Sequence, residues 1–191
     1  VFVEKATHIA LELDLNEAIT KEVLKLSREK QRPVYALPGN LEVILKTQEV
    51  LEGLACFICN HIEAGRICGT DFEENDSQRV LEMLPAFARE RKLQSVVVTL
   101  GPNGCAFFDA VLGAAGVQAA MKVNVVDTCG AGDAFFSGTV AELARGATLT
   151  QAVVTGTRVA ACTIQSTENS CPTLGEQLQK RPPVSPEVCR E

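Results

Sequence analysis

VNVVDTCGAGDAFF, residues 123–136, is the stretch on which the interpretation of the whole chain depends. Its apolar run, residues 123–126, predicts a strand that leads through an acid and a glycine-rich turn into the start of a helix. Small residues in the turn let a ligand come close to the backbone, and free amide N–H groups at a helix start favour an anion. The stretch therefore predicts a phosphate-binding turn at Gly130, Ala131 and Gly132.

Asp133 follows this turn directly, although a carboxylate repels the anion that the turn attracts. A neutral hydroxyl placed between Asp133 and a bound phosphoryl group would resolve the conflict, because the carboxylate could accept the hydroxyl proton while the amides stabilise the phosphoryl charge. The plainer alternative is an ordinary helix N-terminus, where Asp133 only interacts favourably with the helix dipole. The residues on either side of the turn favour the chemical role.

DTCGAGD, residues 127–133, resembles the D-T-x-G-A-G-D signature of the ribokinase (PfkB-type) family of sugar and nucleoside kinases, with Cys129 at the variable place. The resemblance implies that Asp133 is the catalytic base. It implies an anion hole made by the amides of Gly130, Ala131 and Gly132. It also implies support of the phosphate and cation region by Asp127 and Thr128.

Two shorter segments resemble further motifs of that family. Asn60 and Glu63 match N-x-x-E, which implies that they hold the water shell of a Mg²⁺ ion, whereas a capping box at a helix start is the alternative. Thr99, Gly101 and Gly104 match T-x-G-x-x-G, which implies a lining of the nucleotide groove, with a plain turn between strands as the alternative. The loop LPGN, residues 37–40, also follows a strand, but Leu37 replaces the acid found there in the family, so it carries no predicted role.

The order of the remaining elements predicts an α/β fold. Strand, helix and strand patterns alternate from the N-terminus, which is typical of a parallel sheet. Later segments include one helix over 41–54, one over 75–92, and strands in CAFFDAVLG (105–113) and GVQAAMKVNVVD (116–127). We expect a three-layer, ribokinase-like core with a mostly parallel sheet over residues 1–180 and a flexible tail over 181–191. The resemblance covers only about the C-terminal two-thirds of a family member, and the N-terminal part and its β lid have no counterpart here.

Composition excludes several classes of protein. The 18 Lys and Arg residues stand against 24 Asp and Glu residues, for a net charge of −6, which disfavours a nucleic-acid polymer as partner. We expect no membrane span and no secretory signal, and therefore a cytoplasmic location. Most of the eight cysteines are expected to be buried, and the C-x-x-C at Cys56 and Cys59 is not expected to bind a metal.

The function expected from the resemblance is ATP-dependent phosphorylation of a hydroxymethyl group on a small-molecule sugar. ATP and Mg²⁺ are the expected cofactors, with K⁺ as a further candidate, and a homodimer is left open. A nucleoside kinase of the pseudouridine or adenosine type is the second choice. A non-catalytic, nucleotide-binding kinase-like fragment is the rival from another class. A Rossmann dehydrogenase is disfavoured, because no G-x-G-x-x-G follows the first strand.

Overall fold

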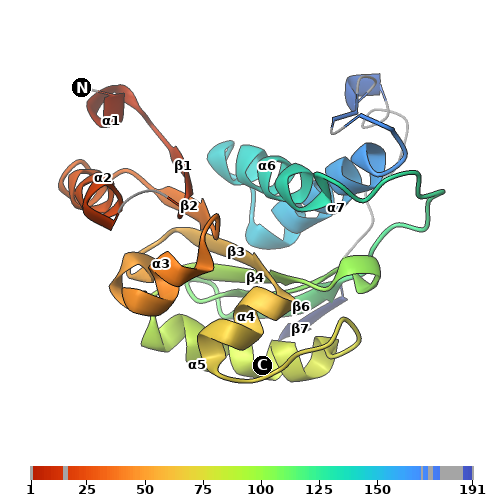
Figure 1. Cartoon of the computed structure of the whole chain (residues 1–191), viewed down its shortest axis with the longest axis horizontal. Helices are drawn as coiled ribbons and strands as arrows, with labels where there is room; N and C mark the ends of the chain where they lie inside the picture. Colours follow the sequence, from red (N-terminus) through yellow and green to blue (C-terminus); the bar gives the residue numbers. More distant parts are fainter. Residues whose placement is uncertain (1, 15–16, 169, 172–173, 177–186, 191) are drawn as a thin grey trace.

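The computed structural model of the chain describes residues 2–14, 17–168, 170–171, 174–176 and 187–190. Within these residues, one seven-stranded sheet runs in the spatial order β1-β2-β3-β4-β5-β6-β7 (Figure 1). Its strands are β1 (Ile9–Glu12), β2 (Val34–Leu37), β3 (Cys56–Asn60), β4 (Ser95–Thr99), β5 (Cys105–Asp109), β6 (Ala114–Gln118) and β7 (Glu187–Arg190).

The sheet has a parallel part and an antiparallel part. Strands β1 to β4 pair in parallel, and β4–β5, β5–β6 and β6–β7 pair antiparallel. Since two successive reversals restore the direction, β6 runs the same way as β1 to β4, so five of the seven described strands share one direction. The mostly parallel α/β sheet expected from the sequence is confirmed.

Helices cover both faces of the sheet and complete the three layers (Figure 1). On one face lie α2 (Glu17–Glu29), α3 (Leu41–Lys46), the 3₁₀ turn η1 (Gln48–Leu51), α4 (His61–Cys68) and α5 (Ser77–Glu90). They share a face because right-handed crossovers between successive neighbouring strands all pass over the same side. On the other face lie α6 (Ala131–Ala144) and α7 (Leu149–Thr163), while α1 (Phe2–Lys5) precedes the sheet.

Two apolar clusters fill the spaces between the layers. Side chains alternate along each strand, so that in β3 Phe57 and Cys59 pack toward α2–α5, whereas Cys56 and Ile58 pack toward α6 and α7. The two thiols of the C-x-x-C therefore lie on opposite faces of the sheet and do not converge on one metal. Burial raises the pKa of Cys56 to about 12 and the pKa of Cys59 well above its ordinary value.

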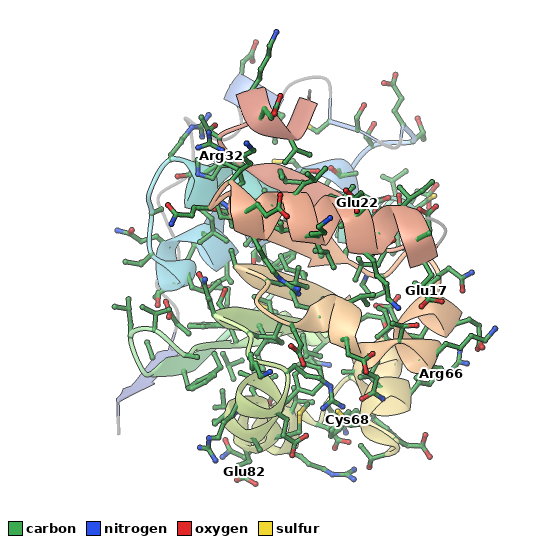
Figure 2. All side chains as sticks on the ribbon, turned by 90° about the vertical axis from the view of Figure 1, so that its left-hand side faces the viewer. Glu17, Glu22, Arg32, Arg66, Cys68 and Glu82 are labelled. Carbon is green, nitrogen blue, oxygen red and sulfur yellow. The ribbon has the colours of Figure 1, made fainter. Side chains whose placement is uncertain are left out.

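The outer face formed by α2, α4 and α5 is polar, as Figure 2 shows. Its labelled side chains Glu17 and Glu22 of α2, Arg66 of α4 and Glu82 of α5 are all exposed to solvent. Most apolar residues of the same helices face inward, which is the usual division on a helix that covers a sheet, although Ile19 of α2 and Ile62 of α4 are exposed. No helix in the described part of the chain is long and apolar enough to cross a membrane.

Glycines let α6 and α7 pack closely against each other. A Cβ on Gly138 would lie 2.7 Å from Cγ2 of Val159. A Cβ on Gly156 would overlap the Thr139 hydroxyl and lie 2.7 Å from the Phe135 carbonyl oxygen. This pair of helices is therefore fixed as a unit above the sheet.

The predicted single helix over 41–54 is wrong. Helix α3 ends at Lys46, and Thr47 has φ −139° and ψ 73°, which no α-helix accommodates. The chain then resumes as the short turn η1, which buries Val50 and Leu51 in the core. Tertiary burial of these two side chains overrides the local helical pattern.

The predicted strand over 123–126 is also wrong. Val125 and Val126 are 54% and 50% exposed, and the amides of Val126 and Asp127 donate to the carbonyl oxygen of Ile164, at the end of α7. Strand β6 already has β5 and β7 as its neighbours, so no free edge is left beside it for another strand. The apolar run instead crosses from the sheet to the helical layer.

Most of the stretch 181–191, expected to form a flexible tail, lies outside the described residues. The exception is Glu187–Arg190, which forms β7 and pairs with β6.

Candidate active site

A pocket of about 220 Å³ lies at the carboxyl ends of β2, β3 and β4, where α4 and α6 begin. Open α/β sheets place ligands at this edge. The pocket brings together five of the residues predicted from the sequence. These are Asn60, Glu63, Thr99, Gly132 and Asp133.

The first turn of α6 forms one wall of this pocket. Gly130 adopts φ 77° at the N-cap, a left-handed conformation that suits glycine, and no described side chain caps the helix. The amide of Ala131 donates to the Thr128 carbonyl oxygen at 3.2 Å, and the amides of Gly132 and Asp133 lie at positions without an intrahelical acceptor. The amides of Gly132 and Asp133 are therefore available to an anion, which the helix dipole also favours.

Asp133 is the third residue of α6, and its side chain is exposed at the pocket. Gly132 beside it leaves room, since a Cβ there would meet no atom within 4 Å. The carboxylate thus lies beside the amide-lined turn and in reach of a ligand, as the chemical interpretation of the sequence requires.

Asn60 and Glu63 form a reciprocal capping box at the start of α4. The Glu63 amide donates to Asn60 Oδ1 at 2.8 Å, and the Asn60 amide donates to Glu63 Oε2 at 2.8 Å. Burial raises the pKa of Glu63, and the hydrogen bond from the Asn60 amide acts in the opposite direction. The box occupies one carboxylate oxygen, which leaves Oε1 free for a water molecule or a cation. The helix cap and the predicted Mg²⁺ role are therefore compatible.

Thr99 lies next to Asn60 because β3 and β4 are in register at these two residues. Its hydroxyl donates to the Cys59 carbonyl oxygen at 3.4 Å. The sheet itself thus places the N-x-x-E and T-x-G-x-x-G segments side by side.

Six predicted residues do not line the pocket. Gly130, Ala131, Asp127 and Thr128 shape the turn before α6, where the Cys129 amide donates to Asp127 Oδ1 at 2.9 Å. Asp127 therefore stabilises the turn through its side chain. Gly101 and Gly104 belong to the turn after β4, which contains the short 3₁₀ helix η2 (Gly101–Asn103) and lies just beyond Thr99.

Sequence reasoning missed the apolar part of the pocket. Leu37, Pro38, Ile58 and Phe136 line it together with Cys59. The position of the loop 37–40 after a strand was the only signal for Leu37 and Pro38. Phe136 follows Asp133 by three residues in α6, and this spacing alone could have indicated that the two side chains share a helix face.

The residues present fit a Mg²⁺ ion that arrives with phosphates. Among the described residues, no group of three or more His, Cys, Asp or Glu side chains is arranged to hold a metal. Mg²⁺ is usually held by one or two carboxylates together with phosphate oxygens and water, and Glu63 lines this pocket beside Asn60.

The profile of the pfkB carbohydrate kinases matches residues 2–173, and the chain belongs to this family. Guanosine-inosine kinase of Exiguobacterium acetylicum is 31% identical over 172 residues, which cover 90% of this chain and 56% of the relative. The fold is similar to Arabidopsis thaliana ribokinase complexed with ribose and ATP, with a TM-score of 0.74 and 23% identity over 93% of this chain and 56% of the other.

Phosphofructokinase-2 of Escherichia coli, solved in complex with potassium, has the same fold at a TM-score of 0.74 and 16% identity, covering 90% of this chain and 54% of the other. The chain therefore spans a little over half the length of these proteins.

Proposed function

We propose that the protein transfers the terminal phosphoryl group of ATP to a hydroxymethyl group of a sugar, with Asp133 as the base. The observation that carries this proposal is the pocket that unites Asp133, the amide-lined start of α6, the Asn60–Glu63 pair and Thr99. Membership of the pfkB carbohydrate kinases supports the same reaction.

In the proposed step, the acceptor hydroxyl lies between Asp133 and the phosphoryl group. The proton moves from the hydroxyl oxygen to the Asp133 carboxylate as that oxygen bonds to phosphorus, and the bond from phosphorus to the leaving ADP oxygen breaks. Within the Gly130, Ala131 and Gly132 segment the Gly132 amide, with the amide of Asp133, would donate to the charged phosphoryl oxygens, whereas the Ala131 amide already donates to Thr128. The apolar side chains of Ile58 and Phe136 limit the access of water to these groups.

Charge explains why a cation belongs in this proposal. Among the residues that the structure describes, the pocket lining contains two carboxylates and no Lys, Arg or His. Mg²⁺, when bound with ATP, supplies the positive charge that the lining lacks, and Asn60 and Glu63 would hold its water shell. Thr99, Gly101 and Gly104 would support the nucleotide, and K⁺ near Asp127 and Thr128 stays a prediction.

A nucleoside acceptor is the second candidate, and the likeness to guanosine-inosine kinase favours it. A nucleoside carries the same kind of hydroxymethyl group as a sugar, so the proposed chemistry is unchanged. A screen of phosphoryl transfer over sugars and nucleosides separates the two candidates.

The test of the mechanism is Asp133→Asn, with Asp71→Asn as a control that removes an exposed carboxylate elsewhere. We expect the Asp133 variant to lose about 10²- to 10⁴-fold in turnover while it keeps its affinity for ATP–Mg²⁺, because the base acts only on the acceptor. Turnover equal to that of the unmodified protein would remove Asp133 from the mechanism. Binding of ATP without transfer to any acceptor by the unmodified chain would favour the non-catalytic alternative.

A further inference from the structure

The carboxylate of Glu74 lies directly over the turn that follows β4. Gly101 has φ 52°, and a Cβ built on it would lie 2.6 Å from Glu74 Oε1 and 3.0 Å from Glu74 Cδ. The side chain is exposed, and among the described residues no hydrogen bond or ion pair engages its carboxylate. Glu74 thus contacts the glycine turn with its acceptor oxygens free.

The loop that carries Glu74, residues 69–76, is held firmly by Arg79 of α5. The Arg79 guanidinium donates to the Asp71 carbonyl oxygen and to the Thr70 hydroxyl, both at 2.9 Å. It also stacks over the Phe72 ring, 5.1 Å from the centroid, and Phe72 is buried. The backbone three residues before Glu74 is therefore anchored to α5, beside the turn that its carboxylate contacts.

The opposite side of the same turn is also fixed. A Cβ on Gly104 would overlap the Gln118 carbonyl oxygen and lie 2.6 Å from the Ala120 amide nitrogen. The turn 101–104 is therefore held between the chain at 118–120 and Glu74. It lies two residues beyond Thr99, which lines the pocket, so a nucleotide whose phosphates occupy the pocket would extend over this turn.

We propose that Glu74 accepts hydrogen bonds from the ribose hydroxyls of the donor nucleotide and so selects ribonucleotides; this rests on the function proposed above. An ionised carboxylate only accepts hydrogen bonds and repels phosphate, so its ligand group must be a neutral donor. The two oxygens of one carboxylate can receive the two neighbouring hydroxyls of a ribose. Such charge-assisted hydrogen bonds are stronger than neutral ones.

The test is isothermal titration of the full chain with ADP–Mg²⁺ and with 2′,3′-dideoxy-ADP–Mg²⁺. We expect the unmodified protein to bind ADP about tenfold more tightly than the dideoxy analogue. Glu74→Ala should bring this ratio of affinities close to one, because it should weaken the binding of ADP and leave the binding of the dideoxy analogue unchanged. Glu73→Ala, which removes the neighbouring exposed carboxylate, should leave the ratio unchanged and is the matched control.

Each outcome decides a different claim. Equal binding of the two nucleotides by the unmodified protein, or an unchanged ratio in Glu74→Ala, overturns the role of Glu74 and leaves the proposed function intact. Glu74→Ala could instead leave the ratio of ADP to dideoxy-ADP affinity unchanged and alter the ratio of ADP to inosine diphosphate affinity. That result would assign the carboxylate to the base of the nucleotide and overturn the ribose contact. Failure of ADP–Mg²⁺ to bind at all overturns the proposed function itself.

Discussion

Glu63 is placed where one carboxylate serves both the fold and the pocket. One of its oxygens closes the capping box of α4, and its side chain also lines the cavity beside Asp133. Partial burial penalises the ionised form and raises the pKa of Glu63 above the ordinary value of 4.5. Ionisation of Glu63 therefore costs stability in the folded protein, and such shifted pKa values are common at functional sites.

This cost predicts a pH dependence. Between pH 4.5 and the raised pKa of Glu63, the folded state keeps a proton that the unfolded state has lost, so the contribution of Glu63 to the free energy of unfolding falls as pH rises. Above the raised pKa the contribution is constant. Glu63→Gln keeps the capping geometry without titrating, so the stability of the unmodified protein relative to this variant should fall across that window.

Urea unfolding in metal-free buffer from pH 4.5 to pH 7 measures this difference. Glu82→Gln, which neutralises an exposed carboxylate on α5, is the control and should show no comparable trend. A stability difference between the unmodified protein and Glu63→Gln that stays constant or rises with pH would contradict the assigned burial.

At this scale the sequence predicted the polar half of the pocket. Asn60 and Thr99 end strands and Asp133 lies in the first turn of a helix, and such positions meet at one edge of an α/β sheet. Leu37 and Phe136 were missed because apolar residues look the same in a core and in a pocket wall. The capping box of Glu63, the alternative to metal binding, is confirmed, and the Mg²⁺ role stays a prediction with which this box is compatible.

The first turn of helix α6 is exposed at the pocket, whereas its middle packs tightly against α7. Substitution of Gly132 in α6 tests the exposed turn, and substitution of Gly156 in α7 tests the packing. Gly132→Ala adds a methyl group where no atom lies within 4 Å, at a residue whose φ is not positive. We expect stability to be unchanged or raised by up to about 1 kcal/mol, because alanine favours a helix over glycine. Nucleotide affinity should fall severalfold, since the methyl group lies where phosphate approaches the amides. Thermal unfolding and titration with ATP–Mg²⁺ measure the two effects.

Gly156→Ala should have the opposite effect on stability. Its methyl group would overlap the Thr139 hydroxyl and press on the Phe135 carbonyl oxygen, so α6 and α7 would have to separate. We expect a loss of about 1 to 3 kcal/mol in the free energy of unfolding, as for other overpacked cores. Gly132→Ala, the same change on the open part of α6, is the control. An equal stability of the two variants would show that the helices are not packed as closely as described.

Helices and strands were predicted well where one pattern of buried residues repeats along the segment, and poorly where the direction of burial changes within the segment. The helix predicted between the first two strands is confirmed as α2, whose buried side is Thr20, Leu24 and Ser27, whereas its apolar Ile19 is 52% exposed. The predicted helix over residues 41–54 is interrupted after Lys46, because burial of Val50 and Leu51 in the core requires the chain to leave the helical path. The run 123–126 has strand-forming residues, but whether a strand forms there depends on an available sheet edge, which no local pattern reveals.

Over the whole molecule, the order of connections decides where the pocket opens. Four consecutive parallel strands send α2 to α5 to one face, which leaves the other face to α6 and α7. The cluster under α6 and α7 begins at Tyr35 of β2, and Ala10 and Glu12 of β1 are exposed. The pocket lies at the border of this covered area, beside the ends of β2 and β3. It is therefore built by the sheet and by the first turn of α6 together.

The charge of the whole molecule predicts that the proposed binding of ATP depends on a divalent cation. The chain carries a net charge of −6, and the described residues that line the pocket include Glu63 and Asp133 but no basic side chain. Free ATP would bring more negative charge to this place, and the amides of α6 carry only partial positive charge. We expect EDTA to weaken ATP binding at least about tenfold, measured by titration calorimetry, because Mg²⁺ neutralises the phosphates.

Two comparisons show whether electrostatics is the cause of this metal dependence. Adenosine has no phosphate, so any binding of adenosine should not change with EDTA. Added salt screens the repulsion between free ATP and the acidic pocket, so the gap between ATP with and without Mg²⁺ should narrow as ionic strength rises. If free ATP binds as tightly as ATP–Mg²⁺ at low salt, a basic group outside the pocket lining must receive the phosphates, and the placement of the nucleotide over Asn60 and Glu63 would be wrong.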